Sequence, residues 1–209
     1  MAASERGDES TSGAGLPAGG RRSFARRVAA AISLDATLYA EIEHDPRAIV
    51  QATAIVTVAG LARGLAALRT DDPIGLAASI AIAYASWAIV TFLLWLVGVV
   101  FDHDTSSFFE LLRTVGFAAS PLVLLALAAL PPLDAPAFVL GVKFATHVAA
   151  AVALVVAARE ALDVSTRRAI VICGVVVGVL AVALATVITV VATKLQGVID
   201  VVVSAASHT

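Results

Sequence analysis

Residues 74–101 read IGLAASIAIAYASWAIVTFLLWLVGVVF, an apolar run of 28 residues without a charged side chain. An α-helix of that length spans about 42 Å at a rise of 1.5 Å per residue. The hydrocarbon core of a bilayer is only about 30 Å thick. The run therefore predicts a transmembrane helix that tilts or protrudes from the membrane. Trp87 and Trp95 within it indicate contact with an interface or with a neighbouring helix.

Four further runs of the sequence are similarly apolar, one before residues 74–101 and three after them. They cover residues 49–68, 108–130, 137–158 and 169–193. Each is long enough to cross the hydrocarbon core, which needs about 20 residues. The polar connections between the runs are short, which favours antiparallel neighbours. The sequence therefore predicts an all-α membrane protein, a bundle of five transmembrane helices.

The composition of the whole chain excludes several other classes of protein. Of its 209 residues, 60% are hydrophobic and 14% are charged, with a mean hydropathy of +0.96. A soluble domain carries about 25% charged residues, so a cytosolic enzyme and a disordered regulator are both excluded. The net charge of −2, without a basic stripe, argues against nucleic-acid binding. Cys173 is the single cysteine, which excludes a disulfide framework and a zinc cluster.

The chain divides into four parts by composition. Residues 1–23 are polar and small, without an apolar face to bury, and we expect a disordered tail. Residues 24–44 predict one or two amphipathic cytoplasmic helices, and residues 45–193 form the five-span membrane domain. Residues 194–209 are expected to be a short tail on the outer side.

The segment 24–44 carries apolar residues four apart, a spacing that places them on one helix face. The two sets are Phe24, Val28 and Ile32, followed by Leu38 and Ile42. A cluster of arginines at its start is expected to meet anionic lipid headgroups at the cytoplasmic face; the cluster is Arg21, Arg22, Arg26 and Arg27. A second and compatible interpretation is a helix docked on the bundle.

The distribution of lysine and arginine predicts the orientation in the membrane. Ten of these residues fall on the side of the N-terminus and four on the opposite side of the five-span arrangement. Cytoplasmic segments carry the excess of positive charge. We therefore expect a cytoplasmic N-terminus and an outside C-terminus in the cell membrane.

Three ionisable residues within the predicted spans form a candidate polar site. Lys143 and His147 are four residues apart and share a helix face, and Arg63 is expected at a depth close to that of Lys143. Such groups inside a membrane are functional candidates by default. The structural alternative is a neutral His147 that bonds a neighbouring hydroxyl or carbonyl. Snorkelling explains Lys143 and Arg63, although together they could also hold a lipid phosphate.

Two pairs of glycines and one Ser-Pro step predict how the helices pack and bend. Gly60 and Gly64 in the first span, and Gly174 and Gly178 in the fifth, have the four-residue spacing of close helix contacts. Each pair packs either within the bundle or at a face between two copies. Ser120-Pro121 predicts a kink, in which the serine bonds a carbonyl that the proline leaves free.

Clusters of acidic and histidine residues are interpreted as solvated caps rather than metal sites. They are His44-Asp45 and Asp102-His103-Asp104. The sequence offers neither a nucleophile–base pair nor a glycine-rich phosphate loop. We therefore expect a protein that is not an enzyme and that needs no metal or other cofactor.

The stretch SFFELLRTVGFAASP, residues 107–121, resembles the signature of the Yip-domain family of five-span membrane proteins. In that family an entry phenylalanine, a basic residue, a glycine–aromatic pair and a proline recur in the third span. Residues 39–48, YAEIEHDPRA, and 158–169, AREALDVSTRRA, resemble its prokaryotic branch. The resemblance implies five spans and a cytoplasmic N-terminus over roughly residues 35–193. The Asp-Leu-Tyr-Gly-Pro segment of eukaryotic members is missing, so their link to small GTPases is not carried over.

The sequence thus favours a non-enzymatic membrane scaffold or partner-binding protein. Its expected partners are the lipid bilayer, another membrane protein and a second copy of the chain. The alternative is a small permease-like transporter or channel, or an accessory subunit of one. The two functions differ in whether a polar path crosses the bundle.

Overall fold

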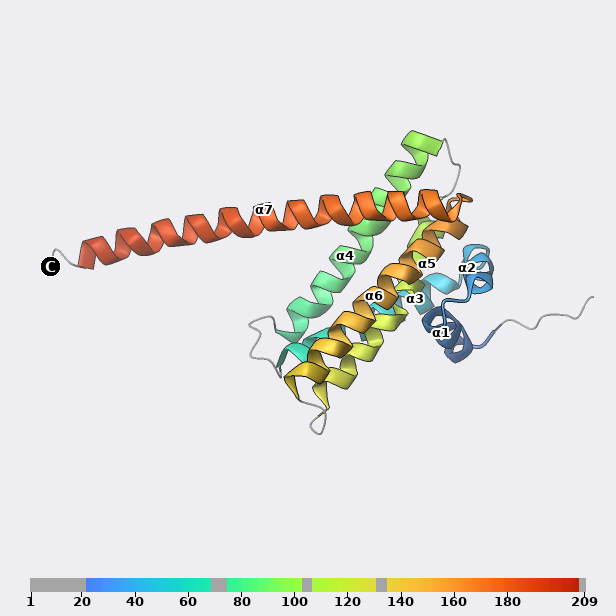
Figure 1. Cartoon of the computed structure of the whole chain (residues 1–209), viewed down its shortest axis with the longest axis horizontal. Helices are drawn as coiled ribbons and strands as arrows, with labels where there is room; N and C mark the ends of the chain where they lie inside the picture. The colour runs from blue at the N-terminus through green and yellow to red at the C-terminus, as the bar shows by residue number, and fades with distance from the viewer. Residues whose placement is uncertain (1–21, 69–74, 103–106, 131–134, 207–209) are drawn as a thin grey trace, which may run out of the picture.

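A computed structural model describes residues 22–68, 75–102, 107–130 and 135–206 of the chain. Within these ranges the chain is helical and has no β-strand. The elements in order are α1 (Phe24–Ile32), α2 (Ala36–Glu43), α3 (Ala48–Leu68), α4 (Leu76–Val97), a π-helical turn η1 (Gly98–Asp102), α5 (Phe108–Ala118), a 3₁₀-helix η2 (Ser120–Ala129), α6 (Pro136–Ala161) and α7 (Thr166–Ala206). Figure 1 shows α3 to α6 as a bundle, with α1 and α2 beside it and α7 extending away.

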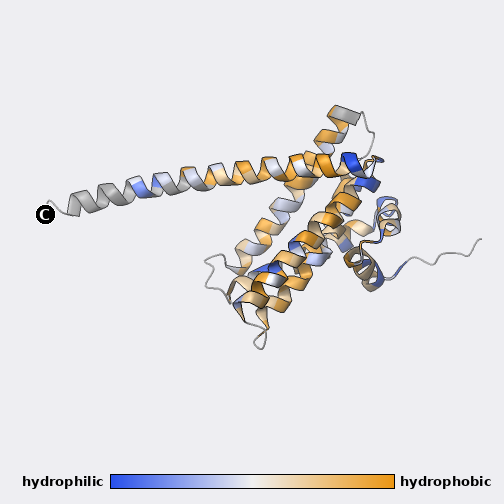
Figure 2. Ribbon diagram, in the orientation of Figure 1, coloured by the Kyte–Doolittle hydropathy of each residue, from blue (hydrophilic) through white to orange (hydrophobic). Residues whose placement is uncertain are grey.

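Five helical segments are long and apolar enough to cross a membrane. They are Ala48–Leu68, Leu76–Val100, Phe108–Ala129, Pro136–Ala161 and Thr166–Val187. Each overlaps one of the five runs expected from the sequence, so the all-α five-span fold class is confirmed. Figure 2 shows the apolar residues covering these helices along their length, with hydrophilic residues gathered on α1, α2 and the α6–α7 turn.

The third span changes helix type in the middle. The α-helix α5 ends at Ala118 and the 3₁₀-helix η2 begins at Ser120, with Pro121 in its first turn. A proline cannot donate the backbone hydrogen bond that a continued α-helix requires. The break therefore lies where the sequence places it, at Ser120-Pro121. The expected role of the serine is wrong, however, because the buried Ser120 hydroxyl has no hydrogen-bond partner.

Helix α7 continues beyond the fifth membrane-spanning stretch. It continues without interruption to Ala206 and has 41 residues, a length of about 60 Å at 1.5 Å per residue. The sequence predicts a fifth span that ends at residue 193 and a short outer tail over residues 194–209, and the described part of that tail is helical. Two charged residues, Lys194 and Asp200, interrupt the apolar pattern there without breaking the helix. Charge ends a membrane-spanning stretch but does not end a helix.

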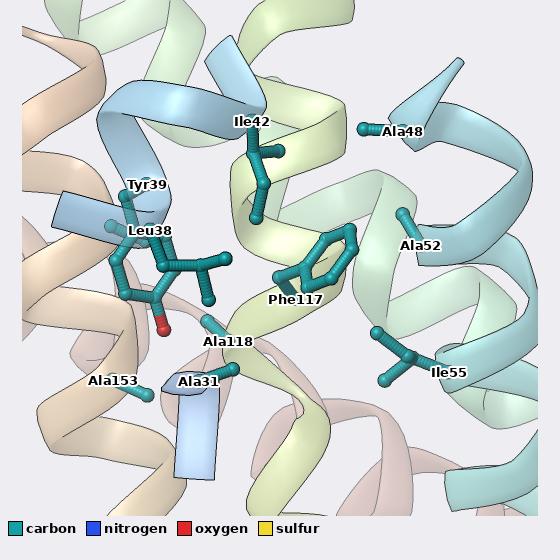
Figure 3. Close-up of a cluster of buried hydrophobic side chains, with 11 residues drawn as sticks. Ala31, Leu38, Tyr39, Ile42, Ala48, Ala52, Ile55, Phe117, Ala118 and Ala153 are labelled. Carbon is teal, nitrogen blue, oxygen red and sulfur yellow. The ribbon is translucent and has the colours of Figure 1, made fainter. Parts of the chain in front are cut away.

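Helices α1 and α2 dock on the bundle rather than standing apart from it. Leu38, Tyr39 and Ile42 of α2 are fully buried beside Phe117 of α5 and Ala153 of α6 (Figure 3). Burial raises the pKa of Tyr39, so the phenol stays protonated. The apolar face expected for α2 is confirmed by the burial of Leu38 and Ile42.

The apolar face expected for α1 is buried only in part. Its two buried residues are Arg27 and Ala31, whereas Phe24 is 42% exposed. Of the residues expected to share one face, Val28 packs against the core beside them. The ion pair of Arg27 also contributes to the buried side, which hydropathy spacing cannot detect.

The two glycine pairs have different surroundings. A Cβ atom at Gly60 would lie 2.9 Å from Ile80 Cα, and one at Gly64 would lie 3.1 Å from Leu76 Cα, so α3 and α4 approach closely there. A Cβ atom at Gly174 or Gly178 would meet no other atom within 4 Å. The expected packing of the second pair within the bundle is therefore wrong. A face between two copies stays a prediction for that pair.

We predict that Gly60→Leu lowers the free energy of unfolding by about 1–3 kcal/mol, because the side chain has no space between α3 and α4. Gly174→Leu is the matched control, in the open part of α7, and should leave stability unchanged or slightly raised. Thermal unfolding in detergent measures both. Equal melting temperatures for the two variants would contradict the close contact at Gly60.

Candidate functional site

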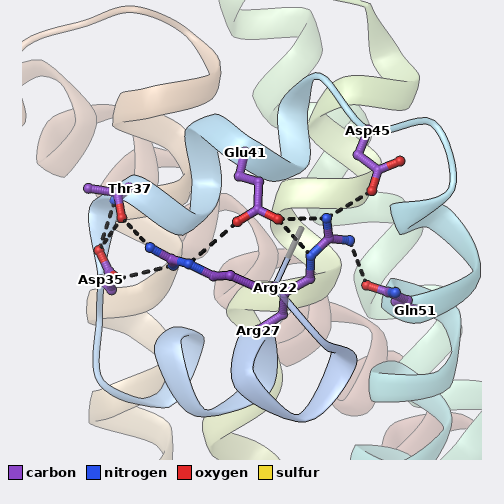
Figure 4. Close-up of polar contacts among 7 residues, drawn as sticks. All are labelled: Arg22, Arg27, Asp35, Thr37, Glu41, Asp45 and Gln51. Carbon is purple, nitrogen blue, oxygen red and sulfur yellow. Dashed lines mark hydrogen bonds and ion pairs between the residues drawn. The ribbon is translucent and has the colours of Figure 1, made fainter. Parts of the chain in front are cut away.

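A buried arginine joins the N-terminal helices to the membrane domain. Arg27 of α1 is 2% exposed. Its Nη2 donates to Glu41 Oε1 at 2.7 Å and to Asp45 Oδ2 at 2.8 Å, and its Nη1 donates to Gln51 Oε1 at 2.9 Å (Figure 4). These acceptors belong to α2, to the α2–α3 turn and to α3. One guanidinium thus fixes three consecutive segments of the chain.

A second arginine continues this network at the surface. Arg22 donates from Nη1 to Asp35 Oδ2 at 3.1 Å and from Nη2 to Thr37 Oγ1 at 2.8 Å. Its Nε lies 3.5 Å from Glu41 Oε2, so Glu41 pairs with both Arg22 and Arg27. The Asp35 carboxylate also accepts the Thr37 amide at 3.0 Å and caps α2.

The opposite charges of the network stabilise one another in their ionised forms. Burial alone lowers the pKa of Arg27, but the hydrogen bonds and negative charges of Glu41 and Asp45 outweigh it, so the pKa is raised. The Thr37 hydroxyl and, more weakly, Arg22 lower the pKa of Asp35. Both groups are therefore ionised at neutral pH. Removal of one member of such a buried pair costs about 3–5 kcal/mol, because its partner stays buried without compensation.

The third span holds α2 from the other side. Arg113 of α5 is 8% exposed, and its Nη2 donates to the Glu43 carbonyl at 2.5 Å. Glu43 is the last residue of α2. Carbonyl groups at a helix C-terminus lack helical partners and carry partial negative charge, which a guanidinium satisfies. Arg113 thus anchors the docked helices to the third span.

The same part of α5 is also where α3 and α4 approach the third span. A Cβ atom at Gly116 would lie 2.6 Å from Ala52 Cβ of α3 and 3.2 Å from Trp87 Nε1 of α4. Trp87 Nε1 donates to the Leu112 carbonyl at 2.9 Å. A larger residue at position 116 would separate these helices. The third span is therefore the element on which the others assemble.

These contacts give local roles to the stretch that resembles the Yip-domain signature. Ser107 and Glu110 form a capping box at the start of α5. Arg113 binds the end of α2, Gly116 permits close approach, and Phe117 is fully buried in the core. The signature thus lies where three parts of the protein meet.

The arginines expected at lipid headgroups have different surroundings in the structure. Arg27 is buried against carboxylates and cannot reach a headgroup, which corrects that expectation. Arg22 is paired with Asp35 and Glu41, while Arg26 is exposed. Arg21 lies outside the described residues.

Of the two clusters of acidic and histidine residues, the structure describes His44-Asp45 in full and the second cluster only in part. His44 Nδ1 bonds the Ala40 carbonyl at 3.0 Å, and Asp45 pairs with Arg27. His103 and Asp104 lie outside the described residues. Within the described ranges, no three histidine, cysteine or acidic side chains gather in a way that would hold a metal ion.

A lateral cavity brings together two of the three predicted polar residues. It has a volume of about 200 Å³, and both Arg63 and His147 line it, whereas Lys143 does not. The rest of its wall comes from α3, α4, the third span and α6, namely Val56, Ala59, Ile82, Ala83, Ser86, Trp87, Val90, Val115, Ala118, Ala119, Leu122, Leu125, Ala150 and Leu154. The wall is thus largely apolar.

His147 bonds the backbone of its own helix. Its Nδ1 lies 2.7 Å from the Lys143 carbonyl, an atom that can only accept. Nδ1 therefore donates this hydrogen bond. This contact is of the kind that the structural interpretation of His147 expects.

The sequence alone did not reveal the contacts that hold the docked helices, above all those of Arg27, Gln51 and Arg113. Arg113 and Gly116 stood out only as the basic residue and the glycine of the Yip-like signature. One signal for the role of Arg113 is that an arginine within an apolar run requires a partner. No comparable signal marks Gln51, because its partner lies 24 positions away in the sequence.

We predict that Arg27→Met lowers the free energy of unfolding by about 3 kcal/mol, because Glu41 and Asp45 then lose the buried positive charge that Arg27 supplies. Arg26→Met is the control, since Arg26 is an exposed neighbour on the same helix. Thermal unfolding of the full chain in detergent measures the difference. A change of similar size in both variants would show that the buried network does not hold α1.

Comparison with known proteins agrees with the architecture. A family model described as the Yip1 domain matches residues 29–187, from within α1 to the end of the fifth span. The searches of curated proteins and of solved structures found no match. The matched region contains all five apolar helices and most of the docked N-terminal segment. The chain is therefore a multi-pass integral membrane protein that belongs to the Yip1 domain family.

Proposed function

We propose that this protein is a non-enzymatic membrane scaffold of the prokaryotic Yip-domain type, which presents its docked helices α1 and α2 to a partner protein. The observation that carries the proposal is the buried Arg27 network. A network of this kind fixes a short helical segment that would otherwise be marginal in water. A fixed surface binds a partner with less loss of conformational freedom than a mobile one.

The candidate binding surface is the exposed side of this segment. Arg26, Ala29 and Ala40 are exposed on α1 and α2, and Arg47 is exposed in the turn just before α3. Hydrophilic residues gather on α1 and α2 in Figure 2. Arg26 and Arg47 thus supply two exposed positive charges to this surface. We expect a partner that offers acidic residues at the membrane surface.

The proposal places this surface in the cytoplasm, with the C-terminus on the outer side of the cell membrane. Its support is the excess of lysine and arginine on the side of the N-terminus. A partner for the docked helices would then be a cytoplasmic protein or the cytoplasmic part of a membrane protein.

Cysteine labelling of intact cells tests the orientation. Single cysteines are introduced as Asp71→Cys, Asp104→Cys, Asp134→Cys and Asp163→Cys, each in a Cys173→Ala background. A membrane-impermeant thiol reagent should label positions 71 and 134 and leave 104 and 163 unlabelled until the cells are opened. Labelling of position 104 in intact cells would contradict the proposed orientation.

Affinity purification in mild detergent tests the scaffold proposal. We predict that a partner co-purifies with the wild-type chain and is lost from Arg26→Glu/Arg47→Glu, because charge reversal repels acidic side chains. Lys194→Glu, a reversal at an exposed position of α7, should retain the partner. Purification of the partner should recover the chain in turn. Equal recovery with all three forms would refute the proposed surface.

The alternative function is transport, and the lateral cavity is the observation that favours it. The cavity places Arg63 and His147 at one apolar site among four spans. Its remaining wall is largely apolar, which offers little to a polar substrate. A pH-dependent flux in reconstituted vesicles that disappears in His147→Ala would favour transport over the scaffold.

A further inference from the structure

The lateral cavity has the chemistry of a site for hydrocarbon with one charge at its edge. Apart from Arg63, Ser86, Trp87 and His147, the side chains that line it are apolar. Its volume of about 200 Å³ exceeds the roughly 150 Å³ of an apolar cavity that stays dry and binds benzene. Trp87 Nε1 and His147 Nδ1 are already bonded to backbone carbonyls. The cavity therefore favours an acyl chain over water.

The cavity opens toward the bilayer rather than into the bundle alone. Arg63, Ile82, Ser86 and His147 line it and are also exposed on membrane-spanning helices. Exposed side chains on these parts of a spanning helix face lipid. An acyl chain from the surrounding leaflet can therefore enter from the side.

The depth of the two basic residues matches the shape of a phospholipid. Arg63 lies five residues before Leu68, the end of α3, which is about 8 Å along the helix axis. His147 lies eleven residues after Pro136, the start of α6, or about 17 Å. Both ends lie on the same side of the antiparallel bundle. The cavity thus extends from near the headgroup level toward the middle of the bilayer.

The charge at the headgroup end is positive. Arg63 is exposed, and its long side chain can extend to the interface while its carbons stay in contact with apolar surface. None of the side chains that line the cavity is a carboxylate. A guanidinium binds a phosphate through two parallel hydrogen bonds. The edge of the cavity is therefore complementary to a lipid phosphate.

From this geometry we propose that the cavity between α3, α4, the third span and α6 binds one anionic phospholipid. Its acyl chain occupies the apolar wall beside Trp87 and His147, and its headgroup pairs with Arg63. This site is separate from the docked helices that carry the proposed scaffold function. The proposal of a lipid site therefore does not depend on whether a protein partner is found.

Native mass spectrometry of the full chain tests the site. The protein is purified in detergent, stripped of lipid and titrated with dioleoyl phosphatidylglycerol or with dioleoyl phosphatidylcholine, which has the same chains and no net charge. We expect one phosphatidylglycerol per chain, retained about tenfold more strongly than phosphatidylcholine. Arg63→Gln should remove most of this difference, since hydrogen bonds between charged groups are the strong ones.

A second variant tests the acyl-chain part independently. Ala150→Phe fills the cavity from α6 and should weaken retention of both lipids about tenfold, whereas Ala151→Phe, next to it and outside the lining, should not. Lys143→Gln removes another cation on this side of the membrane, outside the cavity lining, and should leave retention unchanged. Equal binding of the two lipids by the wild type, or retention unchanged in both Arg63→Gln and Ala150→Phe, would overturn the proposal. If Arg63→Gln fails to fold, the pair at positions 150 and 151 decides.

Discussion

The arrangement of this protein depends on the burial of one charge. Arg27 is almost completely buried. A buried charge is tolerated only with partners that compensate for its lost hydration. Glu41 and Asp45 supply the opposite charge and Gln51 supplies a further acceptor. Because these partners come from consecutive segments, pairing Arg27 also brings α1 and α2 against the start of α3. The position of the N-terminal helices then follows from electrostatics as much as from apolar burial.

The third span supplies the surface against which this pairing takes place. Its first half carries Arg113, Gly116 and Phe117, which contact α2, α3 and α4 or fill the core. Its second half is a 3₁₀-helix, which rises about 2.0 Å per residue against 1.5 Å in an α-helix. Ten residues of this kind lengthen the span by about 5 Å and rotate its side chains relative to α5. The lateral cavity is lined from both sides of this change, by Val115 and Ala118 of α5 and by Leu122 and Leu125 of η2.

The two proposals concern opposite ends of the same bundle. The docked helices form a polar and rigid surface where the Lys and Arg residues are most frequent, which is suited to a protein partner. The cavity opens to lipid toward the other end, beside Arg63 and His147. A close contact at Gly60 holds α3 and α4 together next to it. A lipid in the cavity would touch both helices and the third span, and so would contribute to the packing of the bundle.

The number and approximate limits of the spans could be predicted from the sequence. The length of an apolar run is a local property, and it can be compared directly with the thickness of the bilayer. The capping box at Ser107 and the break at Pro121 are local as well. The packing faces could not be read in this way. The spans are apolar all round, so no periodic pattern says which side of a helix meets another. Hence only the tertiary structure shows that Gly60 is in a tight contact while Gly174 is not. On α1, outside the spans, it likewise shows that Arg27 is buried while Arg26 is exposed. These outcomes depend on residues distant in the chain, whose mutual approach is decided by the whole fold.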